Sequence, residues 1–307
     1  MSQTMRAIRF HEYGVSRKLV LETIPRSEPG PGEALIGVKF AGVNPIDWKF
    51  RSGLYKDFMP VKFPSVPGKD FAGTVEALGS GVSGFSVGQR VFGSANGTYA
   101  DFVVAKAASI AAIPEGLSFA QAASVPLGAL TAWHVVEEAG IAAGSTVIVV
   151  GAAGGVGMFA VQFARLKGAA VTGLASAKNL AFVRGLGAEA VDYATAAAAA
   201  LAGKADLVID TAGGAALENA YALVRKGGTL LTTAGMPNPQ RAAEAGIAAR
   251  AAGNKGSEPL ARIAELLGAR ELVTEVGPVF ELQDAGAAQD LSQTGHGRGR
   301  ILLKVQE

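Results

Sequence analysis

The segment from Ser145 to Gly168 constrains the fold more strongly than any other part of the chain. A run of apolar, mostly β-branched residues is followed by the turn Gly151–Gly157 and then by a helical pattern. Small residues in such a turn let the backbone approach a pyrophosphate, whose charge is favoured by the N-terminus of the following helix. Ala153 stands at the second glycine position of the strict G-x-G-x-x-G pattern, so a tight turn that binds nothing is the alternative. We predict that the turn binds a dinucleotide.

Helical and strand patterns alternate from about residue 118 onwards. Ser118 and Gln121 form a capping-box pattern that opens an alanine-rich helix, and a second helix follows Pro126 towards Glu138. Continuous apolar strands that alternate with helices indicate a parallel sheet covered on both faces. We expect strands within residues 145–151, 169–176, 205–213, 227–235 and 246–253, helices within 155–168 and 177–187, and a short surface helix at 196–201.

The first part of the chain, to about Pro114, has short strand patterns separated by Gly/Pro turns. Strands are expected within residues 33–42, 73–79, 89–93 and 99–105, which favours an irregular β-barrel or sandwich. Residues 271–307 return to strand patterns around a short helix and are expected to fold back onto this first domain. We therefore predict an α/β fold with two domains. The β-rich domain comprises residues 1–120 and 271–307, and the doubly wound parallel-sheet domain comprises residues 121–270.

Charge and composition exclude several classes of protein and site. The 28 Lys and Arg residues nearly balance the 26 Asp and Glu residues, without a basic run, which argues against a nucleic-acid partner. Cysteine is absent, so disulfides and thiolate zinc sites are excluded. The three histidines, His11, His134 and His296, lie too far apart in sequence to form a local metal motif.

Neither the N-terminus nor the most apolar segment indicates a membrane. Residues 142–164 are apolar enough to resemble a membrane span, but their glycine cluster favours a strand–turn–helix. The N-terminus lacks the apolar core of a signal peptide. We expect a cytoplasmic protein with no membrane partner.

The end of the second strand of the expected parallel sheet distinguishes NADP from NAD. An NAD enzyme usually places an acidic residue there, about 20 residues after the turn, to bind the ribose hydroxyls. The stretch Thr172–Asn179 has no acidic residue, whereas Ser176 and Lys178 could bind a 2′-phosphate. Alternatively, Ser176 caps the next helix and Lys178 is a solvated side chain. We expect NADPH as the cofactor.

Several motifs occur in an order that is similar to one superfamily. They are Asn44-Pro45-Ile46-Asp47, Arg51-Ser52-Gly53-Leu54-Tyr55, Pro67-Gly68-Lys69-Asp70-Phe71-Ala72-Gly73, Leu130-Thr131-Ala132-Trp133 and the glycine turn. Together they resemble the medium-chain dehydrogenase/reductase superfamily, in its zinc-free quinone oxidoreductase (zeta-crystallin-like) branch. The resemblance covers essentially the whole chain. It implies a GroES-like catalytic domain, a Rossmann domain and, in many members, a homodimer.

Departures from the zinc-dependent members of that superfamily are informative. Asn44 stands where those enzymes place a cysteine ligand, and Lys69-Asp70 replaces their His-Glu pair. The structural lobe with four cysteines is missing. The resemblance therefore implies an enzyme that works without zinc.

The resemblance also implies roles for particular residues. Asn44 is expected beside the nicotinamide ribose and the substrate, and Tyr55 in the substrate cleft, so these two are the catalytic candidates. Asn44 capping a turn, Tyr55 packing and Thr131 as an ordinary helix residue are the alternatives. Asp47, Trp48 and Lys69 are interpreted as structural, and His296 and Arg298 as candidates for a cleft contact. The expected cofactor contacts are Asn44, Thr131, Gly151, Ala152, Gly154, Gly155, Val156, Ser176, Lys178, Tyr193, Thr211, Ala212, Ala234 and Gly235.

The chemistry available without a metal limits the substrate. A simple alkoxide is about as basic as hydroxide and is far more basic than a phenolate. A quinol anion resembles the tyrosine phenolate, whose conjugate acid has a pKa of about 10. The difference in basicity corresponds to about 8 kcal/mol of anion stabilisation, which the site would have to supply for an alkoxide but not for a quinol anion. Neutral donors such as the Asn44 amide or the Tyr55 hydroxyl would then suffice. We predict hydride transfer from NADPH to a quinone or a similar conjugated carbonyl. An alkenal/enone double-bond reductase and an NADPH-binding structural or regulatory protein are the alternatives.

Overall fold

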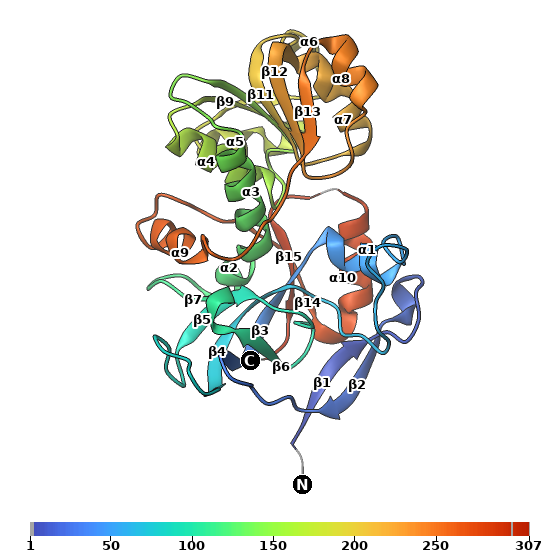
Figure 1. Ribbon diagram of the computed structural model, residues 1–307, viewed down its shortest axis with the longest axis vertical. Coiled ribbons are helices and arrows are strands. Elements are labelled where there is room, and N and C mark those ends of the chain that lie inside the picture. Colours follow the sequence, from blue (N-terminus) through green and yellow to red (C-terminus); the bar gives the residue numbers. More distant parts are fainter. Residues whose placement is uncertain (1–2, 296, 307) are drawn as a thin grey trace. The chain divides into compact units, whose positions relative to one another are not determined.

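Residues 3–295 and 297–306 are described in the computed structural model of the chain, and their contacts separate them into two units (Figure 1). The first unit comprises residues 3–127, 257–295 and 300–306, and the second comprises residues 128–256 and 297–299. Residues 121–127 and helix α9 (Leu260–Gly268), assigned to the second domain from the sequence, belong to the first unit. The buried side chains of α9 explain its place, because the helix packs against β7 (Ile110–Ala112).

The second unit is built on one parallel sheet, as predicted. Its strand order is β10-β9-β8-β11-β12-β13, and every pairing is parallel. The chain moves outward from β8 to β10 and then returns to place β11 on the other side of β8. Such a reversal of strand order is where ligands bind in open α/β sheets. The strands are β8 (Thr146–Val150), β9 (Ala170–Ala175), β10 (Glu189–Asp192), β11 (Ala205–Asp210), β12 (Val224–Thr232) and β13 (Ala248–Ala251).

The helices of the second unit connect these parallel strands. The predicted helices after Pro126, after the glycine turn and at residues 196–201 are confirmed as α3 (Pro126–Glu138), α4 (Gly157–Leu166) and α6 (Ala196–Ala199). The helix expected at 177–187 is a 3-10 turn, η3 (Ala177–Asn179), followed by α5 (Leu180–Gly185). Four elements were not predicted, because elements this short show little periodicity: β10, α7 (Gly214–Ala220), η4 (Tyr221–Leu223) and α8 (Pro239–Ala245).

A seven-stranded sheet and a separate hairpin form the β structure of the first unit. The sheet order is β14-β15-β3-β4-β5-β7, with β6 also pairing β3, and the hairpin joins β1 to β2. The predicted return of the tail is confirmed because β15 pairs antiparallel with β3. The strands β1, β2 and β7 were not predicted. The elements are β1 (Thr4–Arg9), β2 (Val20–Pro25), β3 (Glu33–Val43), β4 (Asp70–Leu78), β5 (Arg90–Ser94), β6 (Phe102–Lys106), β7, β14 (Val276–Glu281) and β15 (Arg300–Lys304).

Short helices complete the first unit, and the sequence patterns did not predict four of them, at residues 16–18, 45–51, 107–109 and 260–268. Helix α1 (Pro45–Arg51) begins with Asn44 at the N-cap, proline at the first turn and Asp47 at the third position, which are helix-start signals. At seven residues it is too short to show a periodic apolar face. The predicted capping box of α2 (Phe119–Ala123) is confirmed. The others are α9, α10 (Ala285–Gln293), η1 (Ser16–Lys18), η2 (Ala107–Ser109) and η5 (Leu282–Asp284).

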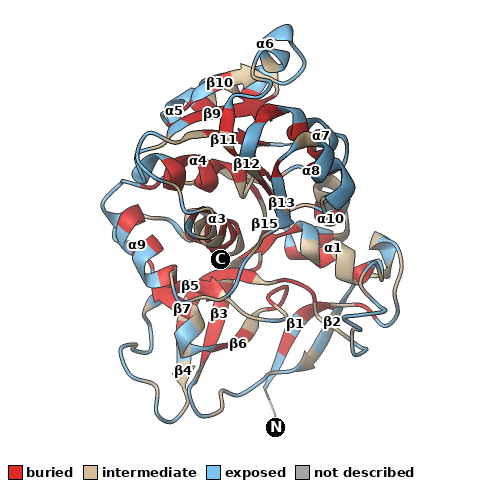
Figure 2. Ribbon diagram, turned by 45° about the horizontal axis from the view of Figure 1, so that its top comes forward, coloured by how far each residue is buried: buried red, intermediate tan, exposed pale blue. Residues whose placement is uncertain are grey.

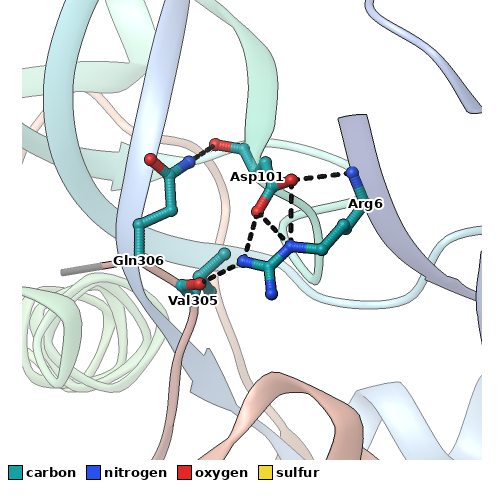
Figure 3. Close-up of polar contacts among 4 residues, drawn as sticks. All are labelled: Arg6, Asp101, Val305 and Gln306. Atoms are coloured by element: carbon teal, nitrogen blue, oxygen red, sulfur yellow. Dashed lines mark hydrogen bonds and ion pairs between the residues drawn. The ribbon is translucent and has the colours of Figure 1, made fainter. Parts of the chain in front are cut away.

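A charged cluster joins the N-terminal hairpin to the last strand (Figure 3). The Arg6 guanidinium donates to Asp101 Oδ1 and to the Val305 carbonyl, both at 2.9 Å, and the Arg6 N–H donates to Asp101 Oδ2 at 2.7 Å. Gln306 donates to the Asp101 carbonyl. Residues separated by nearly the whole chain length are therefore held together within the first unit.

The interior of the first unit contains a polar network, although the central strands of both sheets are mostly buried and apolar (Figure 2). Asp47 Oδ2 accepts hydrogen bonds from the Asn44 N–H and from the Tyr99 hydroxyl, both at 2.9 Å. Arg51 donates from Nε to Gln289 Oε1 at 2.7 Å and from Nη1 to the Gly14 carbonyl at 2.6 Å. These bonds attach α1 to α10 and to the core.

Burial gives Asp47 an unusual titration. Removal from water raises the pKa of Asp47 to about 7, against the lowering effect of its hydrogen bonds from Asn44 and Tyr99. The pKa of an aspartate in an unfolded chain is about 4. Between about pH 4 and about pH 7, Asp47 therefore releases its proton in the unfolded state but retains it in the folded state. This carboxyl therefore lowers the free energy of unfolding as pH rises from about 4 to about 7.

We expect Asp47→Asn to reduce the loss of stability across that pH window, because the amide cannot ionise. The difference in slope should be on the order of 1 kcal/mol per pH unit. Urea denaturation of the variant and the parent at several pH values measures it. Asp57→Asn, at an exposed carboxyl in the turn after α1, should keep the parent slope. Equal slopes for Asp47→Asn and the parent would contradict the prediction.

Candidate active site

The carboxyl edge of the parallel sheet brings most of the predicted cofactor residues together. Strands β8, β9, β10, β11 and β12 all run in one direction, so the loops that follow them share this edge. The loops after β8 and β11 are in contact, because Thr211 Oγ1 donates to the Val150 carbonyl at 2.8 Å. Thr211 therefore lies at the point where the strand order reverses.

The glycine turn is shaped by steric limits at two of its glycines. Gly151 has a φ of +78°, which favours glycine, and a Cβ at Gly157 would lie 2.1 Å from the Gly151 carbonyl oxygen. These two positions hold α4 close to β8. A Cβ at Gly154 would meet only one atom, the Gly151 oxygen, at 3.2 Å, which is a tight contact, and the space above Gly154 is otherwise open. The fold itself therefore restricts Gly154 less than Gly151 or Gly157.

Some backbone N–H groups of the same turn are used by the fold, and others are not. The N–H groups of Gly151 and Ala152 donate to the Leu174 carbonyl at 3.1 and 3.0 Å, which fixes the turn against β9. Within the described part of the chain, the N–H groups of Gly155 and Val156 donate to no other group. Free N–H groups at the start of a ten-residue helix suit a phosphate. The turn thus fits the pyrophosphate of a dinucleotide.

The end of β9 contains the residues expected to distinguish NADP from NAD. Ser176 precedes η3, and its hydroxyl accepts a hydrogen bond from Asn179 Nδ2 at 3.1 Å, so its capping role is present. Lys178 is exposed. Tyr193 follows β10, is 59% exposed, and donates its N–H to the Ala175 carbonyl at 3.2 Å. An exposed aromatic ring therefore lies beside the strand end that carries Ser176.

Asp210 organises two of the expected cofactor loops, and sequence reasoning missed it. Its buried carboxylate accepts from the N–H groups of Ala212 and Gly213 at 3.1 Å, and from the Thr232 hydroxyl at 2.7 Å. The Ala234 N–H then donates to Thr232 Oγ1 at 3.1 Å. Gly235 follows, and a Cβ there would approach only Leu217, at 3.3 Å. The acid that ends β11 was a usable signal, because a carboxylate at a strand end is a common loop anchor.

The positions of three other predicted residues do not by themselves indicate a role in the site. Thr131 is buried within α3, at 8% exposure, and no contact distinguishes it from an ordinary helix residue. Arg298 lies in the second unit, with its guanidinium carbon 5.3 Å from the Phe182 ring centroid. His296 lies outside the described residues.

Asn44 is fully buried at the end of β3 in the first unit, and its amide orientation is determined by Asp70. Asn44 Nδ2 donates to Asp70 Oδ2 at 3.0 Å. Asp70 also accepts from the Leu127 N–H at 3.1 Å and from the Ser94 hydroxyl at 3.3 Å. Asn44 Oδ1 has no hydrogen-bond partner within the described residues. The group that Asn44 leaves unused is therefore an acceptor, whereas the sequence analysis considered it as a donor.

Asp70 is buried beside a buried arginine. Burial raises the pKa of Asp70, and the nearby positive charge of Arg300 lowers it. Burial also lowers the pKa of Arg300, against the opposing effects of Asp70 and Asp47. The Arg300 Nε–H has no hydrogen-bond partner within the described residues. Opposite charges around Asn44 thus balance each other inside the first unit.

Tyr55 belongs to a row of aromatic rings that follows α1. Its ring centroid lies 5.7 Å from that of Phe50 and 5.1 Å from that of Phe58, which is 66% exposed. Lys69 donates to Asn96 Oδ1, and its Nζ lies 5.7 Å from the Phe50 centroid. Asp47 and Trp48 are part of α1, and Asp47 serves the buried network described above. The row gives this part of the first unit an aromatic surface next to one lysine.

Metal ligands are not gathered in the described part of the chain. Residues 3–295 and 297–306 contain no group of three or more His, Cys, Asp or Glu side chains arranged to hold a metal ion. At the positions where the zinc-dependent enzymes place a cysteine and a His-Glu pair, Asn44 donates to Asp70 Oδ2 at 3.0 Å and Lys69 donates to Asn96 Oδ1.

Two protein families match parts of the chain. The Alcohol dehydrogenase GroES-like domain family matches residues 30–115, and the Zinc-binding dehydrogenase family matches residues 186–303. A chloroplastic quinone-oxidoreductase homolog of Spinacia oleracea is 36% identical over 231 residues, which are 69% of this chain and 70% of that protein. A 2-methylene-furan-3-one reductase of Solanum lycopersicum is 33% identical over 76% of this chain and 63% of its own length.

Solved structures are similar over nearly the entire chain. The quinone oxidoreductase from Coxiella burnetii has a TM-score of 0.87 at 32% identity and covers 99% of this chain and 100% of its own. A mycobacterial protein complexed with NADPH has a TM-score of 0.87 at 30% identity and covers 98% of this chain and 100% of its own. None of the helices in the described ranges has the length and apolar character needed to cross a bilayer. The chain belongs to the medium-chain dehydrogenase/reductase superfamily, whose members bind nicotinamide cofactors, and it is an oxidoreductase related to the quinone oxidoreductases.

Proposed function

We propose that this enzyme reduces a quinone, or a similar conjugated carbonyl compound, with NADPH and without zinc. The bond between Asn44 and Asp70 is the observation that carries the proposal. An amide whose N–H group donates to a carboxylate, in a chain without cysteine, offers a poor site for a Lewis-acid metal. The acceptor must then be one whose reduced anion is weakly basic, as a quinol anion is.

The residues at the carboxyl edge of the parallel sheet fit a dinucleotide. The N–H groups of Gly155 and Val156 would bind the pyrophosphate, and the open space above Gly154 would admit it. Ser176 and Lys178 would bind the 2′-phosphate, and the exposed Tyr193 ring would contact the adenosine. The loops at Thr211–Ala212 and Ala234–Gly235, held by Asp210, would line the rest of the cofactor. When bound, NADPH supplies a hydride, a proton comes from solvent, and the quinone becomes a quinol as NADP⁺ forms.

The residues of the first unit would position the reactants. Asn44 Oδ1 would accept a hydrogen bond from a hydroxyl or amide group of a bound reactant, because Asp70 keeps this oxygen free. The Tyr55 hydroxyl would donate to the acceptor oxygen on which negative charge develops. Phe50 and Phe58 would contact the flat apolar ring of a quinone.

A double-bond reductase acting on enones is the second candidate. The relative from Solanum lycopersicum is named for the reduction of a methylene-furanone, which is a conjugated enone. Hydride addition to the conjugated double bond gives an enolate whose oxygen shares the negative charge with carbon. That oxygen is less basic than a simple alkoxide oxygen, so the same metal-free site would serve.

We also propose a homodimer, as the resemblance to the superfamily implies. Strand β13 supports it, since it ends the six-stranded sheet and three of its four residues are exposed. An exposed edge strand is able to pair with a second copy. The cytoplasmic location stays a prediction from the N-terminal sequence.

We expect the purified enzyme to oxidise NADPH with a quinone such as 1,4-benzoquinone and to keep that activity after treatment with a metal chelator. Elemental analysis should show no stoichiometric zinc. Rates with a conjugated enone, measured beside the quinone, distinguish the two candidate functions. Faster turnover of the enone would favour the double-bond reductase. One zinc per chain, together with loss of activity on chelation, would contradict the proposed chemistry.

We expect Gly154→Val to weaken NADPH binding at least about tenfold, because its methyl groups would occupy the space that the pyrophosphate needs. Gly154→Ala should have a smaller effect. The melting temperature of both variants should stay near that of the parent. Gly157→Val is the contrasting variant, since its Cβ would meet the Gly151 oxygen at 2.1 Å and should destabilise the fold itself. Fluorescence titration and thermal denaturation measure the two effects. Unchanged NADPH affinity in Gly154→Val would show that the phosphates bind elsewhere.

We expect a higher kcat/KM for NADPH than for NADH, and we expect Lys178→Glu to reduce or reverse the preference. A lysine near a 2′-phosphate should contribute on the order of 1–2 kcal/mol, or about five- to thirtyfold in affinity. The comparison belongs at low, constant salt, because exposed charges are screened. Lys204→Glu makes the same charge change just before β11, at the amino edge of the sheet, and should preserve the preference. Equal kcat/KM values for the two cofactors in the parent would refute the NADPH assignment.

A further inference from the structure

Residues 297–299 return to the second unit although the segments on either side of them belong to the first. The Gly299 N–H points to the Ala153 carbonyl, at 3.4 Å, within the glycine turn. One residue earlier, the Arg298 guanidinium lies over the Phe182 ring, with its central carbon 5.3 Å from the ring centroid. This short stretch therefore runs from the glycine turn towards α5.

Arg298 thereby joins the face of the helix that carries Lys178. Phe182 follows Lys178 by four residues along the continuous η3–α5 segment, and residues four apart lie on the same side of a helix. Lys178 and Arg298 are both exposed, and Ser176 stands just before this segment. An acidic side chain nearby is Asp192, at the end of the neighbouring strand β10. Its carboxylate accepts a hydrogen bond from the Ala194 N–H at 3.0 Å. Two cations and a hydroxyl are thus brought to one end of β9.

This arrangement matches a phosphate monoester better than a ribose diol. A diol would be bound by a carboxylate, whereas a phosphate with nearly two negative charges needs several donors of positive charge. The ring of Phe182 restricts the guanidinium by a cation–π contact, and a guanidinium can donate two parallel hydrogen bonds to a phosphate. Arg298 extends from the segment beside the glycine turn to Phe182, in the helix that follows β9 and Lys178.

We propose that Arg298 is a specificity-determining residue for the cofactor, binding the 2′-phosphate together with Lys178. The proposal rests on the NADPH preference proposed above. It assigns a binding role to a residue 120 positions after Lys178 in the sequence, in the segment that leads into the last strand.

Calorimetric titration with two probes that differ only in the 2′-phosphate tests the role of Arg298 without turnover. The probes are adenosine 2′,5′-bisphosphate and adenosine 5′-monophosphate. At low salt, Arg298→Gln should weaken binding of the bisphosphate by about tenfold and leave the monophosphate unchanged. Arg298→Lys should retain part of the difference. Arg184→Gln is the matched control, because Arg184 is an exposed cation on α5 two residues from Phe182, and therefore on another side of the helix.

The outcomes separate this proposal from the one on which it rests. If the parent enzyme binds the two probes equally, the NADPH assignment itself fails. If the parent prefers the bisphosphate and Arg298→Gln keeps that preference, only the role of Arg298 is overturned. An equal loss for both probes would place Arg298 on the 5′-phosphate and would also overturn it. An unchanged melting temperature of Arg298→Gln shows that the fold is intact.

Discussion

Burial of the Asp70 carboxylate is the constraint on which the arrangement of the first unit depends. A buried carboxylate needs donors, and Asp70 obtains them from Asn44, Ser94 and the Leu127 backbone, with the charge of Arg300 nearby. Each donor comes from a different place in the sequence, so the end of β3, the strands β4 and β5, and the start of α3 must meet at this point. The same bonds orient the Asn44 amide. In the proposed site, structural and functional demands would therefore be met by a single group.

In the second unit, the proposed pyrophosphate site would depend on backbone N–H groups rather than on side chains. Glycine at 151 and 157 lets the turn pass close under α4, whereas the space above Gly154 stays open. Asp210 then fixes the two loops that follow β11 and β12. A phosphate-binding surface built from N–H groups tolerates sequence change as long as the positions next to the backbone remain small. Alanine at position 153 is therefore compatible with the proposed phosphate-binding turn.

The absence of cysteine can be related to the contacts that Asn44 and Asp70 make. At positions where zinc-dependent relatives are expected to differ, the Asn44 amide donates a hydrogen bond to Asp70. Asn44 Oδ1, which has no partner within the described residues, accepts hydrogen bonds and carries no charge. The buried Arg300 offsets the negative charge of Asp70, so the surroundings of Asn44 carry charges of both signs.

Local signals in the sequence determined the elements whose physics is local. The apolar strand, glycine turn and helix at 145–168, the capping box at Ser118, and the strand patterns of β3 and β9 follow from periodicity and from the conformational freedom of glycine. Only the tertiary structure decided which side chains meet. The partners Asn44 and Asp70 are 26 residues apart, and the loops held by Asp210 become neighbours only because β11 and β12 pair in one register. Arg298 reaches Phe182 only because the tail returns to the second unit. Such contacts depend on sheet register and chain crossing, which leave no periodic trace in the sequence around either partner.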